Sequence, residues 1–257
     1  MSGADETNRF RSDDLLRELR NALDQPPRYS GDDDAQLETT RAARLGVPEI
    51  ILGETKSPEQ VVRLTGLLLD QTGSALISRV TEPILEALKE HYIEDVIEHP
   101  PGSRMVRIQR STAHRDEDRR SLGRVAILTA GTSDVPYAHE VRLVVEEMKS
   151  SARIWPDMGV AGLHRLIQPF REAIDWDVEV FVVLAGMDGA LPSVVSGLSP
   201  IPVIGLPTSV GYGFGGNGEA ALMAMLQTCA PGLTVVNIDN TVGAGIAAAR
   251  IARQSAR

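Results

Sequence analysis

The sequence predicts an α/β protein whose C-terminal half is a three-layer, doubly wound parallel sheet of flavodoxin-like type. Five short, nearly uninterrupted apolar runs follow residue 121, and such runs are typical of parallel strands buried on both faces. Helical segments alternate with these runs through short connections, which favours a parallel sheet covered by helices. The expected strands are 124–130, 152–155, 180–185, 202–207 and 233–238, and the expected helices are 136–150, 160–174, 189–198, 217–229 and 241–253.

The first 120 residues have a different composition. They contain 23 acidic and 17 basic residues, whereas 16 of the 23 glycines follow them. This shift predicts a smaller α/β or α+β domain over 35–120 and a second domain over 121–257, with the charged stretch 111–121 between them. The expected strands of the smaller domain are 49–54, 74–80 and 103–109, and its helices are 57–70 and 81–92. Residues 1–34 are expected to form a helix, over 12–23, and a linker.

Overall composition excludes several classes of protein. A net charge of −9 argues against a nucleic-acid binder, which needs a basic surface. No apolar run approaches the roughly 18 residues of a membrane helix, and the polar N-terminus does not resemble a signal peptide. A single cysteine excludes an internal disulfide framework. We therefore expect a cytoplasmic protein with no nucleic-acid or membrane partner.

Doubly wound sheets bind ligands beyond the carboxyl ends of their strands, so the loops at those ends hold the candidate site residues. The loop after the first strand, AGTSDVP, contains Gly131, Thr132, Ser133 and Asp134. These residues suit a cradle for a phosphate or a ribose, but they equally suit the start of a helix.

The next three strand ends supply further candidates. His164 could move protons, and Arg165 could pair with a phosphate or a carboxylate. Asp188 lies between two glycines and is either a general base or a simple helix cap. The candidate binding residues of these loops are Arg165, Gly186, Met187, Thr208, Ser209, Gly211 and Tyr212. Together they indicate a nucleotide pocket more than a metal site.

Cys229 is the only cysteine and allows two interpretations. A free cysteine is often a small apolar core residue. If Cys229 closes the helix that begins at Asn217, the negative end of the helix dipole also disfavours a thiolate. A cationic substrate would supply the positive charge that the surrounding sequence lacks.

Five segments together resemble the LarB family: TAGTSD, GVAGLHRL, AGMDGALPSVVSGL, PVIGLPTSVGYG and CAPGLTVVNIDN. Members of that family are pyridinium-3,5-biscarboxylic acid mononucleotide synthases of nickel-pincer cofactor biosynthesis. The resemblance covers residues 123–253 in order, and RAARLGVPEIILGETKSPEQ extends it more loosely into the N-terminal half. The C-terminal half is in turn similar to PurE-type aminoimidazole ribonucleotide carboxylases, which share the fold and commonly form octamers.

The resemblance implies a substrate and a mechanism. The substrate is nicotinic acid adenine dinucleotide, whose pyridinium ring is carboxylated at C5 with carbon dioxide or bicarbonate, and hydrolysis of the phosphoanhydride then releases AMP. It implies that Cys229 adds transiently to the ring and that Asp188, where the family usually has Glu, takes or orients a proton. His164 is the alternative proton carrier. Ser133, Asp134 and Arg165 would position phosphate and ribose, or a divalent cation such as magnesium.

Two other functions remain open from the sequence. One is a PurE-like carboxylase or mutase that acts on an aminoimidazole ribonucleotide without using Cys229. The other is a dinucleotide-binding protein with no catalytic activity. The resemblance also implies that this chain forms a homo-oligomer, an octamer.

Overall fold

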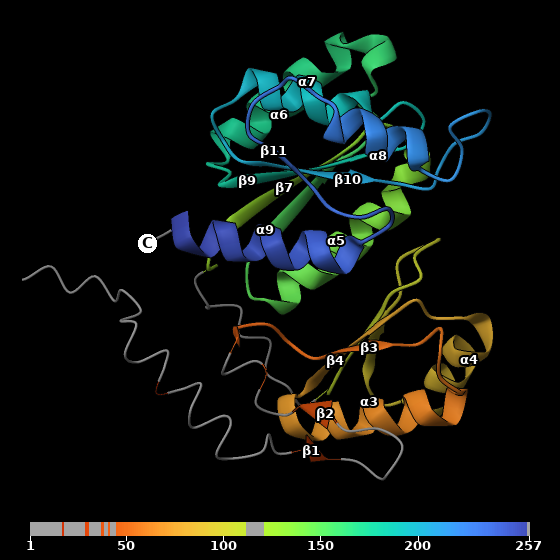
Figure 1. The fold of residues 1–257 in the computed structure, drawn as a ribbon. Helices are drawn as coiled ribbons and strands as arrows, with labels where there is room; N and C mark the ends of the chain where they lie inside the picture. The colour runs from red at the N-terminus through yellow and green to blue at the C-terminus, as the bar shows by residue number, and fades with distance from the viewer. Residues whose placement is uncertain are drawn as a thin grey trace, which may run out of the picture.

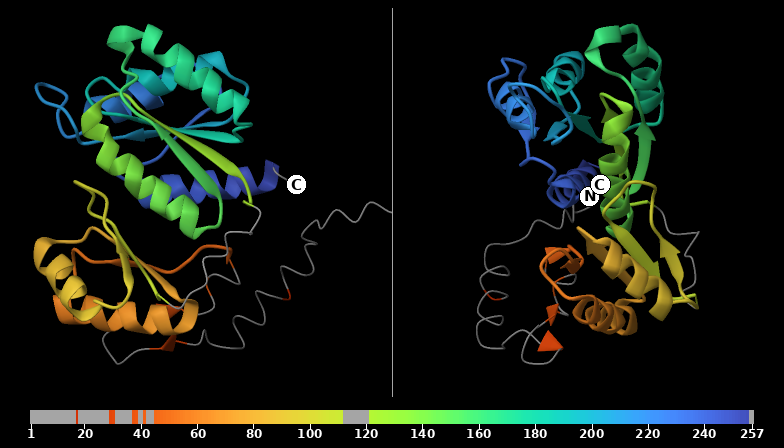
Figure 2. Two further views of the ribbon diagram at one scale, coloured as in Figure 1. Left: turned by 180° about the vertical axis from the view of Figure 1, so that it is seen from behind. Right: turned by 90° about the vertical axis from the view of Figure 1, so that its right-hand side faces the viewer.

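The computed structural model describes residues 45–111 and 121–255, together with Arg17, Arg41 and residues 29–30 and 37–38. It contains five layers, which can be followed in Figures 1 and 2. Helices α6, α7 and α8 cover one face of a five-stranded sheet, and α5 and α9 cover the other. A four-stranded sheet lies on the far side of α5 and α9, and α3 and α4 cover its outer face.

The five-stranded sheet is parallel throughout, with the order β11-β10-β9-β7-β8. In chain order its members are β7 (Arg124–Thr129), β8 (Ser151–Trp155), β9 (Val180–Ala185), β10 (Val203–Pro207) and β11 (Leu233–Val235). The central strands β9 and β10 are buried at every position because helices cover both faces, as their continuous apolar runs indicate. The structure therefore confirms the doubly wound α/β fold.

Helices flank these strands on both faces, with α5 and α9 on one face and α6, α7 and α8 on the other. They are α5 (Val135–Glu147), α6 (His164–Asp175), α7 (Ala190–Leu198), α8 (Glu219–Leu226) and α9 (Thr241–Ser255). Helix α9 packs closely on α5, since a Cβ added to Gly245 would lie 2.7 Å from the Cβ of Val144. The small residues of the last helix are required by this contact.

The N-terminal sheet is mixed, with the order β3-β4-β6-β5. Its strands are β3 (Ile50–Leu52), β4 (Ser74–Ser78), β5 (Val96–Glu98) and β6 (Val106–Gln109), and its helices are α3 (Pro58–Thr72) and α4 (Glu82–His91). Helix α3 begins with a capping box, in which the Ser57 hydroxyl accepts from the Gln60 amide and the Gln60 side chain accepts from the Ser57 amide. Strand β5 is not expected from the sequence, because acidic residues flank its two apolar residues and no apolar run marks it.

The two sheets share a core through α5 and α9. Leu76 of β4 and Met105, just before β6, are buried together with Leu143 and Val144 of α5. Beside this core, Arg107 bonds to Glu98 and Glu146, and Arg142 of α5 bonds to the same two carboxylates. The N-terminal sheet is therefore fixed against α5.

Several expectations need correction or fall outside the described residues. The helix expected over 217–229 ends at Leu226, and residues 160–162 form a 3-10 turn before α6 begins at His164. The helix expected over 12–23, most of the linker, and the stretch 111–121 lie outside the described residues, apart from Arg17, Tyr29, Ser30, Ser111 and Ser121. A two-residue ladder pairs β1 (Tyr29–Ser30) with β2 (Leu37–Glu38). Within the described ranges, no helix is long and apolar enough to cross a bilayer.

Candidate functional site

The loops after β7, β8, β9 and β10 enclose a cavity of about 600 Å³ at the carboxyl edge of the parallel sheet. We call it the strand-end cavity. Eight predicted site residues line it: Gly131, Ser133, Asp134, Gly186, Met187, Asp188, Gly211 and Tyr212. Apolar side chains that the sequence reasoning did not select, among them Val160, Leu191 and Val210, complete its walls. A largely apolar cavity with a few polar groups is typical of a small-molecule site.

The Asp134 side chain links two loops of this site through hydrogen bonds. Its side chain is buried; the Thr208 hydroxyl donates to Oδ1 at 2.7 Å, and the Gly131 amide donates to Oδ2 at 3.0 Å. Burial raises the pKa of the Asp134 carboxyl above its ordinary value, and the two hydrogen bonds partly offset that rise. Thr208 is fully buried and lies behind the cavity wall, so it holds the loops after β7 and β10 together.

Two further contacts connect the loops. The Thr129 hydroxyl donates to the Gly131 carbonyl at 3.0 Å and accepts from the Asp157 amide at 3.2 Å, which joins the loops after β7 and β8. Sequence reasoning missed Thr129, although a hydroxyl as the last residue of a buried strand was a signal. Gly186 approaches the loop after β10 so closely that an added Cβ would lie 2.0 Å from the Val210 carbonyl oxygen.

Asp188 is exposed at the rim of the strand-end cavity. Its Oδ1 accepts from the Ala190 amide at 3.4 Å, at the start of α7. The preceding residue, Met187, has a left-handed φ of 48°, and its amide donates to the Val210 carbonyl. The tight turn at Met187 and the first turn of α7 thus hold the Asp188 carboxylate in position. The carboxylate is accessible to a ligand in the cavity.

Six predicted residues do not line the strand-end cavity: Thr132, His164, Arg165, Thr208, Ser209 and Cys229. His164 is exposed at the start of α6. Arg165 pairs with Asp157 at 2.8 Å, and its guanidinium lies beside Gly159 of the cavity wall. Ser209 donates its amide to Asp239 at 2.8 Å, and its hydroxyl bonds to that of Tyr137 at 3.2 Å.

Cys229 lies at the other edge of the sheet. It is exposed in the connection from α8 to β11, so the interpretation as a buried core thiol is wrong. Leu233, the first residue of β11, pairs with Val203, the first residue of β10, which places this connection at the amino edge. Four residue steps of β10 separate the two edges by about 13 Å. Within one chain the thiol therefore does not face the strand-end cavity.

The described residues contain no cluster of three or more His, Cys, Asp or Glu side chains that could hold a metal ion. Asp134, the carboxylate expected to help with a cation, directs both oxygens at protein donors. We therefore derive no catalytic step through a metal ion.

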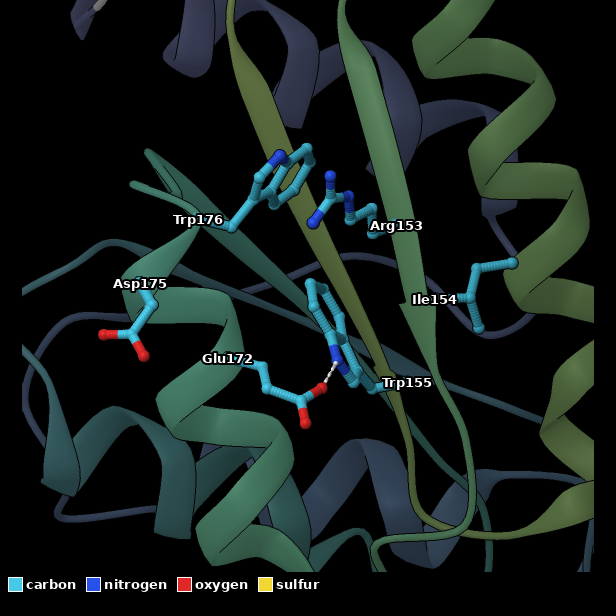
Figure 3. A pocket seen from close by; sticks show the side chains of 6 residues that line it. All are labelled: Arg153, Ile154, Trp155, Glu172, Asp175 and Trp176. Atoms are coloured by element: carbon cyan, nitrogen blue, oxygen red, sulfur yellow. Dashed lines mark hydrogen bonds between the residues drawn. The ribbon is translucent and has the colours of Figure 1, made fainter.

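A separate cavity of about 610 Å³ lies beside the edge strand β8 and helix α6 (Figure 3). Both tryptophans of the chain line it: the Trp155 indole donates to Glu172 at 3.0 Å, and Arg153 lies 4.5 Å from the ring centre of Trp176. None of the predicted site residues is part of this cavity. Glu172 and Arg153 thus each contact a tryptophan of this cavity.

Comparisons with known proteins follow the two halves of the chain. The AIR carboxylase family model matches residues 124–257, just over half of the chain. This chain belongs to the AIR carboxylase family. In addition, the model of a LarB/PurE-like N-terminal domain matches residues 30–110.

Relatives of this AIR carboxylase family member are of two kinds. An uncharacterized protein of Methanocaldococcus jannaschii is 36% identical over 222 residues, which are 85% of this chain and 84% of the relative. A probable N5-carboxyaminoimidazole ribonucleotide mutase of Methanothermobacter thermautotrophicus is 35% identical over 133 residues, 50% of this chain and 37% of that protein. The Thermotoga maritima protein named N5-carboxyaminoimidazole ribonucleotide mutase is 29% identical over 133 residues, 51% of this chain and 75% of that protein.

Among solved structures, a PurE2 variant of Treponema denticola has a TM-score of 0.42 and 21% identity to this chain. The similarity covers 50% of this chain and 78% of that protein.

Proposed function

We propose that this chain carboxylates the pyridinium ring of nicotinic acid adenine dinucleotide at C5 and hydrolyses the phosphoanhydride to release AMP. The observation that carries the proposal is the exposed thiol of Cys229 in an AIR carboxylase family chain with a LarB/PurE-like N-terminal domain. The resemblance to LarB assigns the nucleophile to this position. We place the reaction in the cytoplasm, where a free thiol stays reduced.

The chemistry needs a thiol because a cationic pyridinium is too electron-poor to attack carbon dioxide. Addition of the Cys229 thiolate at C4 removes the positive charge and leaves an enamine whose C5 is nucleophilic. C5 then bonds to carbon dioxide, a base takes the C5 proton, and departure of the thiolate restores the aromatic cation. In total one ring C–H is replaced by a carboxylate and one proton is released.

The strand-end cavity supplies the rest of the site. Its apolar walls exclude water from the ring, and Asp188 at its rim is the base in this proposal. His164 is exposed and does not line the cavity, which favours Asp188 over it. Magnesium enters the proposal as an ion carried by the diphosphate of the substrate.

The position of Cys229 makes the proposed enzyme an oligomer, because a second copy has to bring the thiol to the cavity. Exposed apolar side chains lie at both places. Met187, Tyr212 and Phe214 are exposed at or next to the cavity, and Met223 and Leu226 are exposed on α8 just before Cys229. Association of two copies at these places would cover these side chains.

Two measurements test the proposal. Incubation with nicotinic acid adenine dinucleotide, bicarbonate and magnesium should yield AMP and a mononucleotide heavier by one carboxylate, and Cys229→Ala should abolish both. Co-expression of Cys229→Ala with Asp188→Asn should restore about a quarter of the activity, the share of sites that random mixing leaves intact when two copies form each site. Full turnover by Cys229→Ala would refute the mechanism, and no restoration would refute the shared site.

A second function is favoured by the names of two relatives, which are mutases of N5-carboxyaminoimidazole ribonucleotide. Such an enzyme would use the strand-end cavity for its ribonucleotide and would not need Cys229. Turnover of that ribonucleotide at the same rate by the wild type and by Cys229→Ala would select this function. Tight binding of the dinucleotide without turnover would instead indicate a binding protein.

A further inference from the structure

A smaller cavity, of about 300 Å³, lies where the N-terminal sheet meets the parallel-sheet domain. We call it the interdomain cavity. It shares Ser133 and Val210 with the strand-end cavity, so the two adjoin. Its N-terminal wall consists of Arg79, Gly102 and Arg104. The proposed reaction gives this wall no role.

The two arginines are held side by side. Arg79 follows β4 and Arg104 precedes β6, and the Val80 amide donates to the Arg104 carbonyl at 2.7 Å. Both guanidinium groups bond to Glu54, at 2.9 Å from Arg79 and 3.1 Å from Arg104, so two positive charges share one carboxylate. The arginine side chains are 51% and 53% exposed. Exposed ion pairs are weak, so a phosphate can replace Glu54.

Arg79 also has a strained backbone. Its φ of 51° lies in the left-handed region, where a glycine would fit without strain. Strained residues of this kind are concentrated at functional sites, where interactions of the side chain offset the energy of the strained backbone. The left-handed residue Arg79 directs its side chain to the same cavity as that of Arg104.

The opposite wall carries acidic groups in fixed positions. Asp239 accepts from the Ser209 amide at 2.8 Å, and Glu140 accepts from the Arg104 amide and the Thr241 hydroxyl, both at 2.8 Å. Carboxylates are the usual partners of ribose hydroxyls, as guanidinium groups are of phosphates. A cavity with both suits a ribose phosphate better than a bare polyanion.

A third cavity, of about 370 Å³, shares Arg79, Glu140 and Asp239 with the interdomain cavity. Val47, Pro48 and Ile238 are among its apolar lining residues. The interdomain cavity thus adjoins the strand-end cavity on one side and the third cavity on the other. Such a row suits an extended ligand with a ribose phosphate in the middle.

We propose that the interdomain cavity binds the ribose phosphate of the adenylate half of the substrate, and that the N-terminal domain is thereby a substrate-binding domain. Arg79 and Arg104 bind the phosphate, and Glu140 and Asp239 face the ribose. The identity of the other half, a pyridinium ring in the strand-end cavity, rests on the proposed function.

The test uses AMP as the probe and calorimetry on four forms of the full chain. One form combines Arg79→Gly, which relieves the strained φ, with Arg104→Ala. Its control combines Arg171→Ala with Arg250→Ala, two exposed arginines on α6 and α9, and loses the same charge. The others are the wild type and Glu54→Gln, in which the two arginines lose the carboxylate that they share.

AMP should bind the Arg79→Gly, Arg104→Ala form about 30-fold more weakly than the wild type, because charge-assisted bonds to the phosphate are lost. The control should stay within about twofold, and Glu54→Gln should bind about threefold more tightly. Equal affinity for AMP in the wild type and the arginine variant, or no binding of AMP by the wild type at millimolar concentration, overturns the proposal.

Turnover of nicotinic acid adenine dinucleotide by the same proteins separates the two proposals. Arginine-dependent binding of AMP without any turnover by the wild type supports the subsite and refutes the proposed function. Turnover with the same KM in the wild type and in the arginine variant refutes the subsite and leaves the function standing.

Discussion

Replacement of Thr208 by valine should loosen the strand-end cavity, because it removes the hydroxyl that holds Asp134. Valine has nearly the same shape as threonine, and Thr208 is fully buried, so the change is confined to one hydrogen bond of 2.7 Å. A hydrogen bond to a charged group contributes about 1.5–3 kcal/mol to stability. At about 2–4 °C per kcal/mol for a domain of this size, the melting temperature should fall by about 3–12 °C.

The loss should depend on pH. The pKa of Asp134 is raised above its ordinary value of 3.8, so the stability contributed by this group is fully present below that pH and is lost as the pH rises through the folded pKa. Removal of the Thr208 donor raises the folded pKa further, since the ionised form loses its strongest partner. The difference between variant and wild type should therefore be small near pH 4 and largest at neutral pH.

Chemical denaturation of both proteins across this pH range measures the effect. Thr234→Val is a matched control, because Thr234 is an exposed residue of β11. It should change the free energy of unfolding by less than about 0.5 kcal/mol. A loss in Thr208→Val no greater than in the control, or a loss that is greatest in acid, would refute the role assigned to the Asp134–Thr208 pair.

Three other changes have defined outcomes. Gly186→Ala would place a Cβ 2.0 Å from the Val210 carbonyl oxygen. It should therefore lower the free energy of unfolding by about 1–3 kcal/mol and weaken ligand binding. Asp188→Asn should lower turnover of nicotinic acid adenine dinucleotide about 100-fold and leave the melting temperature unchanged, because Asp188 is exposed. Burial raises the pKa of Glu147, which accepts from the Ser74 hydroxyl, so Glu147→Gln should remove a loss of stability that the wild type shows as the pH rises.

Each change has its own control. Gly197→Ala adds a Cβ that meets nothing within 4 Å and should not destabilise the protein. Asp175→Asn and Glu86→Gln alter exposed carboxylates on α6 and α4 and should leave turnover and the pH dependence of unfolding as they are. Wild-type turnover in Asp188→Asn, or unchanged pH dependence in Glu147→Gln, would contradict the corresponding assignment.

The apolar runs were sufficient to predict the parallel sheet, because a strand buried on both faces needs a continuous apolar sequence whatever its neighbours are. The strand-end rule then selected eight residues that line the strand-end cavity. The same reasoning missed Val160 and Val210, because the sequence does not distinguish an apolar loop residue that lines a cavity from one that packs in a core. It also missed β5, whose two apolar residues lie among acidic ones and form no apolar run.

Cys229 shows most clearly what could not be predicted from the sequence. Its sequence context predicted a helix end, but the helix stops at Leu226 and the thiol is exposed at the amino edge of the sheet. The edge on which a residue lies depends on where the chain turns after a helix, and only the packed structure determines this.

By itself, the sequence determined the doubly wound architecture and the loops in which a ligand site must lie, since local periodicity and chain order are sufficient for both. Only the tertiary structure decided that Asp134 is buried against Thr208 and that Cys229 is remote from the strand-end cavity. It alone brought Arg79 and Arg104 beside Ser133, because these contacts join residues from separate domains. Such contacts depend on how the formed helices and strands pack together, and this packing leaves no periodic pattern in a single sequence.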